Sequence, residues 1–324
     1  MKVWSSFVFL WLVAILASSC SKKDFPTSPS NPPDTTAKKD TVALAIYQTY
    51  PLDTTTFYDG ITLCRLDPNE LPNVAGMAAS RLHQGMTWVC NDKGGSSLIY
   101  LIDTTGAIRA RVTVAGAPQN DWTDMAVGPG PESGIPYLYI ADIGDSKEGR
   151  PYVYIYRVRE PTMTLSSSSA VTGSTETAEK ISFQYPDSPR DAETLLLDPS
   201  TKDLYVVSKD LGVNLYCLPY PQRTDTIVTA TKLIRFPTFQ SPRAGCISPD
   251  GNEILIKELT SIYYWKRMKG ETILQSLLRT PSLVPLAQEA KGEAMCWSAT
   301  GDAYFTISKF ANNVIPPLNV YRRK

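Results

Sequence analysis

The sequence predicts an all-β fold, and within that class a β-propeller of five four-stranded blades. Short runs of Val, Ile, Leu, Tyr and Thr, bounded by Gly, Pro, Asp and Asn, recur after residue 42, where helical periodicity is hard to find. One phrase returns five times at intervals of roughly 50 to 70 residues: a polar cluster, an apolar strand, a turn, and a second strand that ends in polar residues. Such repetition is typical of propeller blades.

The clearest copy covers residues 191–210, and the strands expected at 213–218 and 231–236 complete one blade. The other copies align on the turn between their two strands, at residues 73–92, 121–145, 242–258 and 292–309. A two-sheet sandwich would also explain short strands and turns. It would not explain why the same phrase returns with polar residues at the same two places, so the propeller is favoured.

The fifth blade runs out of sequence after its third strand, near residues 319–322, whereas the domain opens with an orphan strand at residues 42–47. We expect this N-terminal strand to supply the missing fourth strand and to close the ring. Closure of that kind pairs the two ends of the domain and removes exposed strand edges. A sixth, degenerate blade built from residues 42–70 is the alternative.

The N-terminus has the pattern of an export signal. Lys2 precedes an apolar stretch at residues 3–17 that is too short to span a bilayer, which needs about 20 residues. The small residues Ala17, Ser18 and Ser19 stand directly before Cys20 and resemble a lipobox. We therefore expect residues 1–19 to be a lipoprotein signal peptide and Cys20 to carry the lipid.

Residues 20–41 are rich in Ser, Lys, Asp, Pro and Thr and have no hydrophobic period, which predicts a disordered tether between the lipid and a domain at 42–324. The expected location is the bacterial cell envelope, as an outer membrane lipoprotein on its periplasmic or surface-exposed face. The charge is balanced, with 32 Lys and Arg against 32 Asp and Glu, so nothing indicates a nucleic-acid partner. We expect a monomer.

Five cysteines follow Cys20, all within apolar strand-like runs and none with CxxC spacing: Cys64, Cys90, Cys217, Cys246 and Cys296. This pattern predicts buried thiols, and no zinc site can be recognised.

Several phrases resemble those of a broad group of bacterial secreted or lipid-anchored β-propellers. They are NDWTDMAV at 120–127, YLYIADIGD at 137–145, IYRVREP at 155–161, DAETLLLD at 191–198 and QEAKGEAM at 288–295. The group's own phrases run NDWEDIAVGP, YLYIGDIGDN, YRVPEP, DAEALLVDP and QGEAI. The group looks distantly similar to calcium-dependent propeller hydrolases, namely β-propeller phytases and the paraoxonase class. The resemblance implies the fold and says little about activity.

In a propeller, the loop into the innermost strand and the loop out of the second strand open on the same face, around the central channel. The recurring polar positions should therefore meet at one mouth of the channel. The positions at the start of the innermost strands are Ala75, Thr123, Glu193, Arg243 and Glu293. The candidate binding residues on this face are Asp121, Asp124, Asp142, Asp145, Asp191, Glu193, Lys209, Arg243, Glu293 and Lys309.

Carboxylates crowded at a channel mouth repel one another unless a cation or a basic side chain neutralises them. One expectation is a calcium ion held by Glu193, Glu293 and Asp191, since hard oxygen ligands suit Ca²⁺. The other is that Arg243 and the lysines neutralise these carboxylates, which then bind strand ends and neighbouring blades.

The chain has one histidine, His83, expected in the turn between the first two strands of blade one, on the face opposite the mouth. This argues against Ser-His-Asp and Cys-His catalysis, and no GxSxG, P-loop or dinucleotide motif is present. We expect a binding or scaffold module whose channel face takes a glycan, peptide, small molecule or protein. The alternative is a Ca²⁺-dependent hydrolase, phosphoesterase or lactonase-like, in which Glu193 and Glu293 hold the metal and Lys209 or Arg243 stabilises developing charge.

Overall fold

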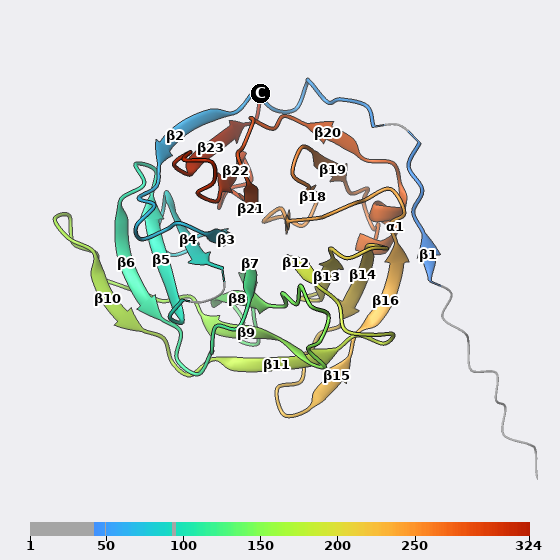
Figure 1. Cartoon of the computed structure of the whole chain (residues 1–324), viewed down its shortest axis with the longest axis horizontal. Helices are drawn as coiled ribbons and strands as arrows, with labels where there is room; N and C mark the ends of the chain where they lie inside the picture. The colour runs from blue at the N-terminus through green and yellow to red at the C-terminus, as the bar shows by residue number, and fades with distance from the viewer. Residues whose placement is uncertain (1–41, 49, 93–94) are drawn as a thin grey trace, which may run out of the picture. The chain divides into compact units, whose positions relative to one another are not determined.

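The computed structural model describes residues 42–48, 50–92 and 95–324. Five small sheets stand in a ring around a common axis (Figure 1), which confirms the predicted all-β propeller with five blades; the alternative sixth blade is wrong. The expected signal peptide, the expected lipidation site Cys20 and the expected tether lie outside the described residues. Within the described part, no helix has both the length and the apolar character needed to cross a bilayer.

In blades 1 to 4, the four main strands follow chain order from the axis to the rim. Blade 1 contains β3 (Val74–Ala79), β4 (Met86–Asn91), β5 (Leu98–Asp103) and β6 (Ile108–Thr113). Blade 2 contains β7 (Trp122–Pro129), β8 (Pro136–Asp142), β9 (Val153–Arg159) and β11 (Glu179–Gln184). Blade 3 contains β12 (Ala192–Leu197), β13 (Leu204–Ser208), β14 (Asn214–Leu218) and β16 (Thr231–Arg235).

Blade 4 contains β17 (Ala244–Ile247), β18 (Glu253–Lys257), β19 (Ile262–Lys266) and β20 (Ser282–Val284), with the short helix α1 (Ile273–Leu278) before its last strand. Blade 5 contains β21 (Gly292–Trp297), β22 (Ala303–Ser308), β23 (Pro317–Arg322) and, as its outermost strand, β2 (Ile61–Arg65). The innermost strands β3, β7, β12, β17 and β21 each contact the next one around the axis.

The ring is closed by an N-terminal strand, as predicted, but the strand assigned to that role is wrong. β2 completes blade 5, pairing antiparallel with β23 from Ile61 opposite Val320 to Arg65 opposite Pro317. The expected orphan at residues 42–47 contains β1 (Ala43–Leu44), which instead lies parallel to β16 on the outer edge of blade 3. The reason is packing: Tyr47 is buried there among Phe236, Phe239 and Trp265.

Outside the ring, further strands extend the outer edges of the blades. β10 (Val171–Ser174) runs parallel to β6 of blade 1, and β15 (Ile227–Thr229) runs parallel to β11 of blade 2. β10 belongs to the connection between β9 and β11 of blade 2, and β15 to the connection between β14 and β16 of blade 3. Blades 1 and 2 are thus each extended by a strand from the blade that follows. The described residues between 42 and 65, here called the belt, pass along blades 3, 4 and 5 in turn (Figure 1).

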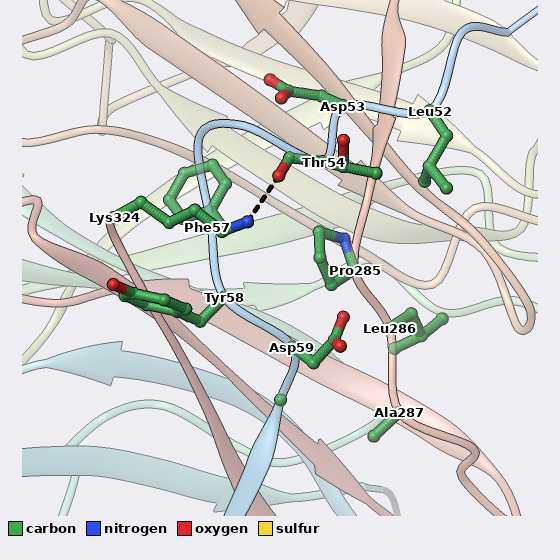
Figure 2. A pocket seen from close by; sticks show the side chains of 11 residues that line it. Leu52, Asp53, Thr54, Phe57, Tyr58, Asp59, Pro285, Leu286, Ala287 and Lys324 are labelled. Atoms are coloured by element: carbon green, nitrogen blue, oxygen red, sulfur yellow. Dashed lines mark hydrogen bonds between the residues drawn. The ribbon is translucent and has the colours of Figure 1, made fainter.

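C-terminal residues fasten the belt. Lys324 Nζ donates to the Thr54 carbonyl at 2.5 Å (Figure 2), and Arg323 lies over the Phe57 ring while it pairs with Glu253 of blade 4 at 2.6 Å. A cavity of about 540 Å³ remains under the belt, lined by residues 52–54, 57–60, 285–287 and 324. The belt therefore ties both ends of the domain to blades 4 and 5.

The hydrophobic core lies between the blades, as five clusters, one for each pair of neighbours. Trp88 and Trp122 fill the space between blades 1 and 2, Trp265 that between blades 3 and 4, and Trp297 that between blades 4 and 5. The five cysteines of the described part are free thiols, each buried or half-buried. The described residues from 42 onward form one compact unit that contains every sheet and every cluster.

Candidate functional site

The innermost strands share a local irregularity at the mouth of the channel. In four of them the ladder skips one residue, passing from Val74 to Gly76, Trp122 to Asp124, Ala192 to Thr194 and Gly292 to Ala294. The skipped residues are Ala75, Thr123, Glu193 and Glu293, which are the positions singled out in the sequence. A bulge re-aims the side chain of its extra residue, and here it brings Glu193 and Glu293 from non-adjacent blades to one arginine.

That arginine is Arg243, which stands directly before β17. Its backbone N–H donates to the carbonyl oxygen of Lys257 at 2.8 Å. Its Nη1 lies 3.3 Å from Glu193 Oε2 and 3.1 Å from Glu293 Oε1. On the blade 3 side, Lys209 contacts Glu193 and also lies 3.3 Å from Asp191 Oδ2. One arginine thus bridges blades 3 and 5 through their carboxylates.

The chain of ion pairs continues into blade 1. Lys309 Nζ lies 3.6 Å from Glu293 Oε1 and 2.7 Å from Asp92 Oδ2, and Lys291 lies 3.9 Å from Glu293. We call the connected set the mouth network. It runs through Asp191, Lys209, Glu193, Arg243, Glu293, Lys309 and Asp92, with Lys291 at one side, and joins blades 3, 4, 5 and 1.

Blade 2 faces the mouth with a separate, more buried group. Asp142 is fully buried; it accepts hydrogen bonds from Asn120 Nδ2 at 2.7 Å and Asp121 N at 3.1 Å, and it pairs with Arg150 at 2.8 Å. Asp121 packs on Gly144, where an added Cβ would meet its carboxyl carbon at 2.4 Å. These carboxylates hold the loop before β7 against the loop after β8.

Asp145 connects this group to blade 3. Its backbone N–H donates to Asp191 Oδ1 at 2.8 Å, and its carboxylate accepts from the Arg150 backbone N–H at 2.6 Å. Asp191 therefore binds both Lys209 of its own blade and the loop of blade 2.

Asp124 lies apart from the other candidates, within the wall of the channel. It is fully buried and accepts the N–H of Met125 and, across the blade boundary, that of Leu195, both at 2.8 Å. The N–H of Gly245 in blade 4 is a third donor. Burial raises the pKa of the Asp124 carboxyl well above its usual range. Its surroundings give it a role in joining blades 2, 3 and 4.

Within the mouth network, the pKa values of Glu193 and of its partner Lys209 are both raised. Burial, followed by the charge of Glu293, raises the pKa of Glu193 from 4.5 to about 7, against the attraction of Lys209 and Arg243. Burial opposes the charged form of Lys209 as well, but the attraction of Glu193 outweighs it and raises the pKa of Lys209. The charge of Glu193 therefore changes near neutral pH.

Sequence reasoning missed two buried carboxylates. Glu289 pairs with Lys257 at 3.1 Å, with both side chains fully buried, and Glu289 also accepts from Thr306 and Asn319 of blade 5. Glu289 stands in the phrase QEAKGEAM, so a signal was present. The second Glu of that phrase is Glu293, and it alone is among the residues predicted for the mouth.

Glu160 is the second carboxylate, and it ends the phrase IYRVREP before its proline. It accepts hydrogen bonds from Ser80 Oγ at 2.5 Å, Arg81 N at 3.1 Å and Trp88 Nε1 at 2.9 Å. All three donors belong to blade 1, so Glu160 of blade 2 joins the two blades on the face opposite the mouth.

As arranged, the oxygens expected to hold calcium do not form a cage for a cation. Those of Glu193, Glu293 and Asp191 face Lys209, Arg243, Lys309 or a backbone N–H. No group of three or more Asp, Glu, Cys or His side chains in the described ranges is placed to hold a metal ion. The arrangement matches the other expectation, in which basic side chains neutralise the mouth.

No protein-family model matches the sequence, and a search of curated proteins likewise finds no match.

The raised pKa of Glu193 predicts a pH-dependent stability. A carboxyl whose pKa is higher in the folded state stabilises the fold fully below about pH 4.5 and loses that contribution as the pH rises through about 7. Glu193→Gln removes the titration, so between pH 4.5 and 8 its free energy of unfolding should gain about 3 kcal/mol relative to the parent protein. Urea unfolding at the two pH values measures this.

Exposed Glu132 provides the control, because the hydroxyl of Tyr137 and then Arg159 lower its pKa. Glu132→Gln should show no such gain. Parallel pH profiles for Glu193→Gln and the parent protein would contradict the assignment.

Proposed function

We propose that the chain is a lipid-anchored binding module of the bacterial cell envelope, acting as a monomer, which presents the mouth of its propeller channel to a polar, charge-bearing glycan or peptide. The observation that carries this proposal is the convergence of charged side chains from four blades on one mouth. Lys209 and Arg243 keep about a fifth of their side-chain surface exposed, and Lys291 keeps about half. A ligand at the mouth can therefore exchange hydrogen bonds with the network.

The composition of the network favours ligands that carry charge. The ion pairs leave the mouth close to neutral, so an uncharged apolar ligand would gain little there. A ligand with carboxylate or ammonium groups can replace one partner of an ion pair, which is least costly at Glu193, since burial already disfavours its charge. The ligand class follows from this: acidic or amino-bearing glycans, or charged peptides.

Binding is favoured over hydrolysis for two reasons. The only histidine in the sequence, His83, precedes β4, with its Nε2 3.0 Å from the Pro161 carbonyl, away from the mouth. The carboxylates of the mouth network are each bound to a basic side chain, so none is placed as a free base beside a nucleophile. The calcium-dependent hydrolase is retained as the alternative for the test below.

Anchoring is tested through Cys20. The parent protein should sediment with membranes and incorporate labelled palmitate, whereas Cys20→Ala should incorporate none and should leave the membrane fraction. Cys64→Ala, at a half-buried thiol in β2, is the matched control and should stay lipidated. A labelled, membrane-bound Cys20→Ala protein would rule out the anchor.

Binding is tested on an array of acidic and amino-bearing bacterial envelope glycans and charged peptides. Arg243→Gln removes the centre of the mouth network, and we expect at least tenfold weaker binding, the equivalent of about 1.4 kcal/mol. The control is Arg159→Gln, which breaks an exposed pair with Glu132 of the turn between β7 and β8, on the face opposite the mouth, and should bind as the parent does. Circular dichroism checks that both variants fold.

The proposal fails if the parent protein binds no member of the array, or if Arg243→Gln binds unchanged. The hydrolase alternative predicts a different result. It requires turnover of a phosphoester or lactone substrate that EDTA abolishes, together with a melting temperature that EDTA lowers.

A further inference from the structure

The end of the channel opposite the mouth opens into an apolar funnel. Its wall is formed by the turns that follow the innermost strands of blades 1 to 4, and it encloses about 420 Å³, within the size range of small-molecule pockets. Its apolar lining includes Leu82, Pro129, Ile135, Pro199, Ile247 and Pro249. A narrower cavity of about 30 Å³ within the channel shares lining residues with it.

Arg81 lies at the junction, lining both the funnel and the narrower cavity. Its Nη1 donates to the carbonyl of Ala299 in blade 5, and its side chain forms no ion pair with any described residue. Burial lowers the pKa of the guanidinium, and the charge of Glu160 opposes this shift only in part. Cations in apolar surroundings are ordinarily paired, so the half-buried guanidinium of Arg81, which has no ion-pair partner among the described residues, offers a place for an anion.

The carboxylate that acts on Arg81 is already engaged elsewhere. Glu160 accepts the Ser80 hydroxyl, the Arg81 backbone N–H and the Trp88 indole N–H, so its oxygens are directed at blade 1 donors and not at the guanidinium. The local sequence therefore holds Arg81 in place through its backbone and leaves its charge without a carboxylate.

The chemistry of Arg81 sets the kind of partner it can take. A guanidinium can only donate hydrogen bonds, and it carries a positive charge. A ligand group at the junction of the two cavities therefore has to accept hydrogen bonds, and a negatively charged acceptor also compensates the charge of Arg81.

We propose that the funnel is a binding site for an amphipathic monocarboxylate, a fatty-acid-like anion whose carboxylate pairs with Arg81 while its apolar chain lies along the prolines and aliphatic side chains of the wall. Charge selects the anion, because a cationic amphiphile would place a second positive charge beside Arg81. The apolar wall favours a ligand with a hydrocarbon chain, because the turns that form it present aliphatic side chains and prolines. This site lies on the opposite face from the proposed mouth site and does not depend on it.

Calorimetric titration with decanoate, below its micelle concentration, tests the proposal on residues 42–324, the self-contained propeller. Arg81→Gln and the funnel-filling Ile247→Trp should each weaken binding at least tenfold. Arg223→Gln, which breaks an exposed pair with Asp225, is the matched control and should bind as the parent does. Methyl decanoate and decylammonium should bind at least tenfold more weakly than decanoate to the parent domain.

Each other outcome overturns the proposal. Equal affinity for decanoate, its methyl ester and decylammonium would show unspecific apolar adsorption, and unchanged binding by Arg81→Gln would remove the carboxylate contact. Tighter binding of the apolar peptide trileucine than of decanoate would replace the fatty anion with a peptide. Ile247→Trp leaves Arg81 intact, so the test stands even if Arg81→Gln does not fold; absence of binding by the parent domain also rejects the site.

Discussion

The structure depends on one constraint: five innermost strands each present a strand edge to the same axis, where no further strand can pair with them. Backbone N–H groups at such an edge need other acceptors, because a buried, unpaired amide is costly. Asp124 meets this need for three blades by accepting the N–H groups of Met125, Leu195 and Gly245. A carboxylate that looks like a ligand-binding residue in the sequence is thereby committed to the fold.

The same crowding shapes the rest of the channel. A Cβ on Gly76 would lie 2.6 Å from the Asp124 carbonyl carbon, so this glycine allows the innermost strands of blades 1 and 2 to approach each other. At the mouth, where the innermost strands begin, the bulges turn the side chains of the extra residues away from the packed space between the blades. Glu193 and Glu293 reach Arg243 in this way. The channel is therefore polar and ion-paired at one end and apolar at the other.

Much of this could be predicted from the sequence, because the blade phrase has a short period and its polar positions are local. The recurring strand, turn, strand phrase gave five blades and the set of residues that meet at the mouth. The closing strand was misassigned because nothing local distinguishes residues 42–47 from Ile61–Arg65. Their places are decided by partners far away in the chain, Phe236 and Trp265 in one case and β23 in the other.

Roles at the site were harder to predict than positions. Asp124 follows Asp121 by three residues in one blade phrase, and Glu193 follows Asp191 by two residues in another. Despite these similar places, Asp124 is fully buried in the channel wall, whereas the pKa of Glu193 lies near neutral. Burial raises the pKa of both carboxyls, and their cross-blade neighbours then set them apart. Asp124 accepts backbone N–H groups of Leu195 and Gly245, whereas Glu193 faces the charge of Glu293, and no local pattern contains these neighbours. Arg81 in the funnel was missed for the same reason, since its isolation depends on what Glu160 binds.

The most direct test of the account is amide hydrogen exchange at the axis, followed by NMR on the propeller domain. The N–H groups of Leu195 and Gly245 face no strand, yet we predict that they exchange as slowly as amides inside the blades, because Asp124 accepts them. In Asp124→Val they should exchange at least tenfold faster, whereas the amide of Val206, inside blade 3, should follow only the change in global stability. Unchanged protection of Leu195 and Gly245 in Asp124→Val would contradict the account.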